Sequence, residues 1–343
     1  MNIDLVIIVL FLVITLTVGF YCGKGVTTFQ DYAIGNRKMD SFIIAVSIIA
    51  TIYGGRSLLA LDAFYQESFY KTFDLIYFVM LFLGSRFIIL RMKECTGHLS
   101  IAESMGSLYG PTTRMITGIF GIMLSIVMLT PQFKVGLSIT ETLWPEIEQF
   151  SAYSGIILAL LVISYTAFGG ARAVAITDLY QFFLFGVCFP IMIFICICYA
   201  KKPLASWQQL TEIPQLTTKE VFQSTKLLQD TLNAFVYGLC HPFFPAWIQR
   251  FYMSSSIQQA SKGFYKSTCI QLIFTIVCLT IVMVLHLGNH DIKNNQHIID
   301  YLVKLARFPG IRGIIVTAIM ALLMSTADSY LHIASDLQMM YYL

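Results

Sequence analysis

The sequence predicts an all-α polytopic membrane protein. Of its 343 residues, 57% are hydrophobic and only 12% are charged, whereas a soluble domain is nearer half apolar and a quarter charged. The mean hydropathy of +0.73 agrees with this. Nine apolar runs are long enough to cross a bilayer as helices; they cover about residues 3–22, 42–62, 73–90, 113–133, 153–171, 177–199, 233–251, 267–287 and 311–335.

Several other classes are excluded by what the chain lacks. The first run has no preceding basic segment and no small-residue cleavage site, so we expect a retained span rather than a signal peptide. A net charge of +3 gives no reason to expect nucleic acid as a partner. GxSxG, HExxH and P-loop motifs are absent, and the six histidines show no metal-ligand spacing. We therefore expect neither an enzyme nor a bound cofactor.

The basic residues favour one orientation in the membrane. With the N-terminus outside, the inside segments hold eleven Lys and Arg residues, while the short outside turns hold only Lys71 and Lys134. The positive-inside tendency then predicts a cell-membrane protein with an outside N-terminus and a cytoplasmic C-terminus. Two long outside loops remain, and the helical spacing of residues 297–308 predicts a surface helix in one of them.

The last apolar run carries four oxygen-bearing side chains within five positions: Ser325, Thr326, Asp328 and Ser329. Ser and Thr in a membrane helix often bond only the carbonyl one turn earlier. The added carboxylate of Asp328 makes local bonding alone a less favoured explanation, because an isolated buried carboxylate needs a cation, a donor or a proton. We expect a polar site here.

The second run is interrupted at its centre by Gly54-Gly55, followed by Arg56. Paired glycines allow close helix packing, or they interrupt a helix and expose carbonyls that suit a hard cation. Arg56 keeps its charge, so it forms a structural ion pair or faces a solute. Asp178, at the start of the sixth run, is either an ordinary helix cap or has a role beyond capping.

These segments resemble the sodium:solute symporter family. YTAFGGARAVAITDLYQ, residues 165–181, follows the family pattern YT-x-x-GG-x-x-AV-x-x-TD-x-x-Q almost throughout. DYAIGNR (31–37), ATIYGG (50–55), QRFYMSSSIQQA (249–260) and ALLMSTADS (321–329) are similar to further family segments in the same order.

The resemblance implies an incomplete five-plus-five inverted-repeat fold in one membrane domain, residues 1–343. Residues 1–30 would be an extra N-terminal helix and loop, and 31–200 the first five-helix repeat. Residues 201–232 would be an outside loop, and 233–343 a partial second repeat. The ninth and tenth core helices are not found in this chain, so a second polypeptide could supply them.

Site residues also follow from the resemblance. It implies Na⁺ bound by the carbonyls of Ala50, Tyr53 and Leu322 and by the hydroxyls of Ser325 and Thr326. Asp178 and Asp328 would line a sodium exit or secondary site. The solute would lie near Gly54, Gly55 and Arg56, against Gln132, Tyr237 and Trp247.

The function that the resemblance implies is sodium-coupled symport of a small organic solute by alternating access, with Na⁺ as the coupling ion and the lipid bilayer as surroundings. The alternatives are a truncated or split-gene symporter without transport of its own, and a solute-sensing membrane module. Arg56 favours a carboxylate-bearing solute, whereas the similarity of ATIYGG to choline-type members favours a cation. A sugar or vitamin also stays open, as do stoichiometry and oligomeric state.

Overall fold

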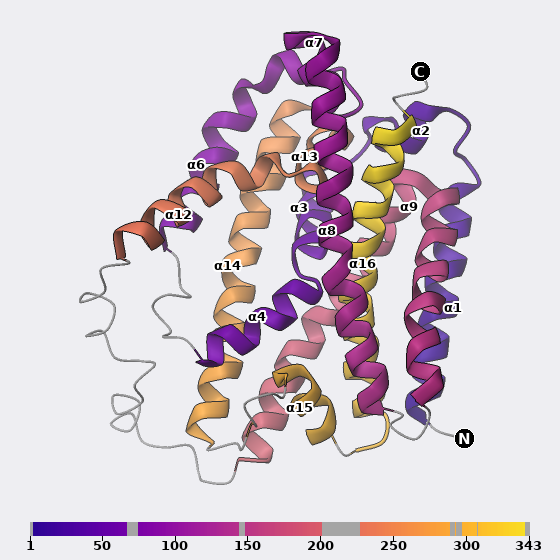
Figure 1. The fold of residues 1–343 in the computed structure, drawn as a ribbon, viewed down its shortest axis with the longest axis vertical. Helices are drawn as coiled ribbons and strands as arrows, with labels where there is room; N and C mark the ends of the chain where they lie inside the picture. The colour runs from indigo at the N-terminus through magenta and orange to yellow at the C-terminus, as the bar shows by residue number, and fades with distance from the viewer. Residues whose placement is uncertain are drawn as a thin grey trace.

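The computed structural model describes residues 3–66, 75–143, 148–200, 227–288, 292, 297–306 and 308–339, and these are almost entirely helical (Figure 1). The helices are α1 (Ile3–Gly23), α2 (Phe29–Ile34), η1 (Gly35–Arg37), α3 (Ser41–Ile52), α4 (Gly55–Gln66), α6 (Leu75–Leu83), η2 (Gly84–Ile88), η3 (Ile89–Cys95), α7 (Ile101–Tyr109), α8 (Pro111–Leu143), α9 (Glu148–Cys198), α12 (Leu227–Cys240), η5 (His241–Phe243), α13 (Pro245–Met253), α14 (Ile257–Leu287), α15 (Ile298–Leu305) and α16 (Ile311–Met339). No strand occurs in the described ranges beyond one isolated bridge, Met39 with Ser254.

Fewer single helices could span a membrane than the nine runs suggested. Within the described residues, six helices are long and apolar enough, or seven if the bent pair α3–α4 counts as one span. The difference has two sources. Helix α9 contains two of the expected runs, and the run at 233–251 is divided between α12 and α13, each too short to span alone.

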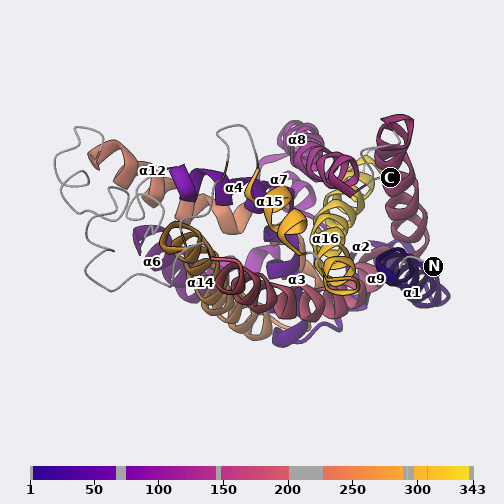
Figure 2. The same ribbon diagram turned by 90° about the horizontal axis from the view of Figure 1, so that it is seen from below.

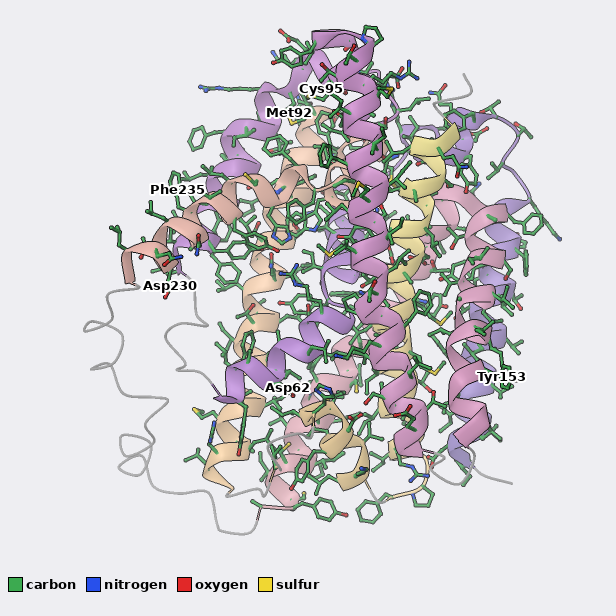
Figure 3. All side chains as sticks on the ribbon, viewed as in Figure 1. Asp62, Met92, Cys95, Tyr153, Asp230 and Phe235 are labelled. Atoms are coloured by element: carbon green, nitrogen blue, oxygen red, sulfur yellow. The ribbon has the colours of Figure 1, made fainter. Side chains whose placement is uncertain are left out.

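Helix α16 lies at the centre of the bundle, and its surroundings explain its polar content. In the most apolar part of α16, 83% of residues are buried, against 22% in α1 and in α8. Figures 1 and 2 show α16 between α8, α1 and α9. The outer helices instead expose large apolar side chains such as Tyr153 and Phe235 (Figure 3), as expected of a surface that faces lipid. A buried central helix is where a membrane protein can keep hydroxyls and a carboxylate.

Glycine pairs lie at two interruptions of helical backbone. At Gly54-Gly55 the axis turns by 61° between α3 and α4. In α9, Gly170 has φ 56° and ψ −160°, and a Cβ there would lie 2.6 Å from the carbonyl oxygen of Tyr32. Only glycine fits both this backbone conformation and this close approach.

Polar caps determine several helix starts. Ser256 accepts a hydrogen bond from the Gln259 amide and so caps the start of α14. The predicted surface helix is α15, and Asp62 of α4 accepts from the Ile298 amide at its start, 2.7 Å away. The expected outside loop at 201–232 lies mostly outside the described residues.

Candidate functional site

The break between α3 and α4 is the structural centre of the site. The last helical hydrogen bond of α3 runs from the Tyr53 amide to Ile49, and α4 starts again at Gly55. A Cβ at Gly54 would lie 2.3 Å from Thr326 Oγ1 and 2.7 Å from Gln132 Oε1. The break therefore lets two other helices, α16 and α8, approach the α3–α4 backbone.

Four oxygens from α3 and α16 meet at this break. The Ser325 hydroxyl donates to the carbonyls of Ala50 at 2.9 Å and Leu322 at 3.1 Å. The Thr326 hydroxyl bonds the same two carbonyls at 3.4 and 3.1 Å. Because the α3 helix ends just beyond it, the Ala50 carbonyl belongs to the last turn, whose carbonyls lack helical partners. We call these four residues the oxygen cage.

The oxygen cage has the donor chemistry of a site for a hard monovalent cation. Its ligands are neutral carbonyl and hydroxyl oxygens, and Ser325 and Thr326 are buried. The α3 carboxyl terminus also contributes the negative end of its dipole. Tyr53 lies at this terminus, but its side chain turns to α14, where the hydroxyl donates to the Gln271 carbonyl at 2.9 Å.

A buried arginine network lies beside the oxygen cage. Arg250 is 1% exposed and forms an ion pair with Asp178 at 3.3 Å. It donates to Ser47 at 3.0 Å, Thr51 at 2.9 Å and Ser329 at 2.6 Å. The network thus joins α3, α9, α13 and α16 and reaches Ser329, one turn beyond Ser325.

Asp328 lies three residues beyond Ser325 in α16 and has its own donors. Its Oδ2 accepts from the Tyr165 hydroxyl at 2.8 Å and from the Thr177 hydroxyl at 3.4 Å. The Oδ1 atoms of Asp178 and Asp328 are both buried without a hydrogen-bond partner. Two buried carboxylates near one guanidinium leave the region with excess negative charge when both are ionised.

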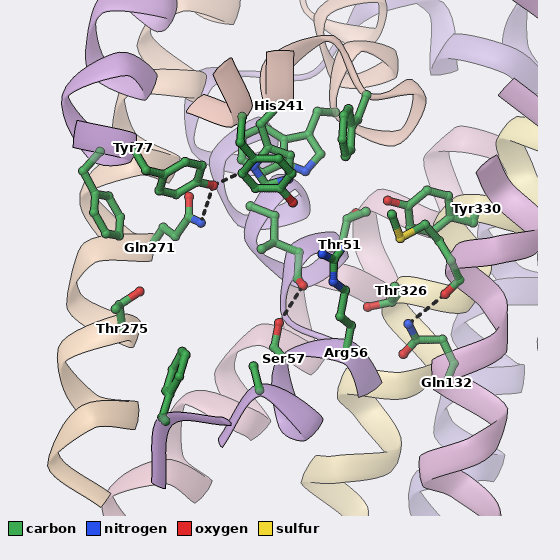
Figure 4. A pocket seen from close by; sticks show the side chains of 18 residues that line it. Thr51, Arg56, Ser57, Tyr77, Gln132, His241, Gln271, Thr275, Thr326 and Tyr330 are labelled. Atoms are coloured by element: carbon green, nitrogen blue, oxygen red, sulfur yellow. Dashed lines mark hydrogen bonds between the residues drawn. The ribbon is translucent and has the colours of Figure 1, made fainter. Parts of the chain in front are cut away.

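A cavity of about 250 Å³ opens on the α4 side of the break (Figure 4). Both aromatic and polar side chains line it. His241 Nδ1 lies 2.6 Å from the Tyr77 hydroxyl, which also accepts from Gln271 Nε2 at 2.9 Å. Thr326 lines this cavity as well as the oxygen cage, so the two sites share a wall.

Comparisons with known proteins now identify the family. The model of the sodium:solute symporter family matches residues 32–341. The chain belongs to the sodium:solute symporter family. It is similar to the high-affinity proline transporter PutP of Bacillus subtilis (strain 168), with 24% identity over 94% of this chain and 70% of the transporter.

A solved structure shares the fold. Its title describes the substrate-bound outward-open state of a Na⁺-coupled sialic acid symporter with a novel Na⁺ site. The TM-score is 0.85 at 17% identity, over 98% of this chain and 72% of that one. The family and both relatives are transporters rather than enzymes, and nothing in these matches supports a second polypeptide.

Within this symporter fold, the residues expected near the solute come together. Arg56, Gln132, Tyr237 and Trp247 all line the cavity. Gly54 and Gly55 are not among the lining residues; they lie at the break beside the cavity, where the Gly55 amide donates to Gln132 Oε1 at 2.6 Å.

Other symporter site residues were missed by the sequence reasoning. Arg250 was included only as part of the family-like segment QRFYMSSSIQQA, although it is the ion-pair partner of Asp178. Tyr77, His241 and Gln271 were not singled out at all. A signal was present for Gln271 and His241, because each is a polar residue in or beside an otherwise apolar run.

Proposed function

We propose that the chain is a sodium-coupled symporter of a small organic solute. The oxygen cage is the observation that carries this proposal, because it joins a broken helix to a hydroxyl-bearing helix in a chain of the sodium:solute symporter family. The proline and sialic acid transporters that it resembles support the same function.

Sodium would bind at Ala50, Leu322, Ser325 and Thr326, with the Tyr53 carbonyl as a further ligand. Bound Na⁺ would hold α3 against α16 and so fix the geometry of the break. The solute would then bind in the adjacent cavity and the site would alternate its access. Coupling requires only that Na⁺ and the solute both bind more tightly to the same conformation of the protein.

Asp178 and Asp328 would line the path by which sodium leaves. Both carboxylates are buried. Asp178 follows Thr177 in α9 and Asp328 precedes Ser329 in α16, and the Thr177 hydroxyl donates to Asp328. The proposed symporter is a single membrane domain with internal boundaries at residues 30, 200 and 232, and its C-terminus lies in the cytoplasm.

The test is the thermal stability of the purified chain in Na⁺ and in K⁺, for the wild type and for Ser325→Ala/Thr326→Ala. A ligand that binds only the folded state stabilises it by RT ln(1 + [L]/Kd), or about 2.7 kcal/mol at 100 Kd. We expect Na⁺ to raise the wild-type melting temperature and to leave that of the double variant unchanged.

Thr17→Ala is a matched control, since the exposed Thr17 hydroxyl makes the same local type of bond, to the Val13 carbonyl at 2.7 Å. This variant should keep the full Na⁺ effect. An undiminished Na⁺ effect in the double variant would refute the assignment of the cage.

A further inference from the structure

The charge of the cavity indicates the chemistry of the solute. Arg56 points into the cavity from the start of α4 (Figure 4), close enough to interact with Tyr237 and His241. None of the described lining residues is Asp or Glu. No carboxylate in the part of the chain that the structure describes forms an ion pair with Arg56. Its guanidinium therefore leaves the cavity with a positive charge that no described side chain of the wall compensates.

The backbone adds to this positive potential. Helix α4 begins at Gly55, directly at the cavity, so the positive end of its dipole faces the same space as Arg56. Thr326 separates the cavity from the oxygen cage, so a bound Na⁺ would place a second full charge behind this wall. A cationic solute would be repelled by all three contributions, whereas an anionic group would be attracted by each of them.

The opposite wall presents an acceptor without a donor. Gln271 is 7% exposed, and its Oε1 has no hydrogen-bond partner, while its Nε2 donates to the Tyr77 hydroxyl. A buried carbonyl oxygen of this kind gains free energy when a ligand N–H or O–H donates to it. The aromatic rings of Tyr77, Tyr237 and Trp247 also line the cavity and suit an apolar or ring-shaped body.

We propose that the solute carries a carboxylate, which the Arg56 guanidinium holds at the start of α4, and a hydrogen-bond donor, which Gln271 accepts. This rests on the proposed symport function and narrows its solute to small carboxylic acids, amino and imino acids included. Of the two solute chemistries that the sequence left open, the proposal selects the carboxylate-bearing solute over the choline-like cation. The bound carboxylate would lie between Arg56 and the wall that separates the cavity from Na⁺. Its negative charge would then favour the binding of Na⁺ and solute together.

The experiment compares matched pairs of probes by thermal stabilisation of the purified chain in Na⁺ and in K⁺. The pairs are L-proline with L-prolinamide, lactate with lactamide, and glycine betaine with choline; in each pair only one member has a carboxylate. Arg56→Gln and Arg56→Lys are measured beside the wild type. Arg91→Gln, an exposed arginine of η3 that does not line the cavity, is the matched control.

We expect the carboxylate member of at least one pair to bind about tenfold or more tightly than its partner, because a hydrogen bond to a charged group is involved. Arg56→Gln should remove this preference, Arg56→Lys should retain part of it, and Arg91→Gln should keep all of it. An intact Na⁺ effect in Arg56→Gln would show that this variant is folded.

Two results would overturn the proposal. One is that, in every pair of which a member binds, the amide or choline stabilises the chain as much as its carboxylate partner does. The other is a carboxylate preference that Arg56→Gln leaves unchanged. A carboxylate preference without any Na⁺ effect would instead contradict the sodium cage and leave the role of Arg56 supported, so the two failures are distinguishable.

Discussion

At the scale of single residues, Arg250 is the charge on which the buried polar network depends. Its guanidinium contacts a carboxylate and three hydroxyls from three other helices. An arginine retains its proton under all ordinary conditions. The network thus has a permanent cation at its centre, and removal of that cation would leave the Asp178 carboxylate buried without compensation.

We predict that Arg250→Gln lowers the stability of the chain by about 3–5 kcal/mol, the usual cost of breaking a buried ion pair on one side. Asp178→Asn added to this variant should recover part of the loss, because no uncompensated charge is then left. Thermal unfolding of the four proteins in the mutant cycle measures both effects. Strictly additive losses would contradict the pairing.

The sequence identified Asp178 as a candidate but not its partner, and the reason is physical. Asp178 and Arg250 are 72 positions apart, and helical periodicity tells which residues share a face of one helix. It does not tell how that helix is rotated or tilted against its neighbours, which packing decides. The Tyr77–His241–Gln271 group was missed for the same reason.

At the scale of helices, the break between α3 and α4 depends on the absence of side chains at two positions. Gly54 lies against Thr326 and Gln132, while a Cβ at Gly55 would lie 2.5 Å from the Pro131 carbonyl oxygen. Here the sequence was informative, because a glycine pair within an apolar run is typical of a helix break or of close backbone packing. Only the structure shows that α16 and α8 approach the backbone at this break.

We predict that Gly54→Ala abolishes the Na⁺-dependent rise in melting temperature, because the added methyl group overlaps Thr326 Oγ1 and displaces it from the cage. Gly186→Ala is the control, since its nearest neighbour would be Phe274 Cζ at 3.9 Å. That variant should be neutral or slightly stabilised, by up to about 1 kcal/mol from helix propensity. A normal Na⁺ effect in Gly54→Ala would contradict the described contact.

At the scale of the whole molecule, apolar run lengths were sufficient to predict an all-helical membrane protein. Membrane thickness imposes span length, so this inference needs no knowledge of packing. The number of unbroken helices was predicted less well, because glycine and proline positions decide whether a run is one helix or two. The segment at 233–251 illustrates this, since His241–Phe243 form a separate short 3-10 helix within it.

The proposed orientation gives a prediction about access from the two sides of the membrane. Lys304 of α15 and Lys93 of η3 are both exposed. Helix α15 lies at one end of the bundle, and Met92 and Cys95 of η3 lie toward the other end (Figures 1 and 3). In a background lacking the exposed Cys198 and Cys240, Lys304→Cys should react with an impermeant maleimide in intact cells. Lys93→Cys should react only after permeabilisation. The reverse pattern would place the N-terminus inside.

The helix break has an electrical consequence. The end of α3 and the start of α4 present opposite dipole ends side by side, one suited to a cation and the other to a carboxylate. One Na⁺ and one carboxylic acid anion of net charge −1, such as lactate, bound there form a pair without net charge. The membrane voltage does work of about 2.3 kcal/mol per elementary charge per 100 mV, and on a neutral pair it does none. Such a one-to-one cycle would draw its energy from the sodium concentration gradient and not from the voltage.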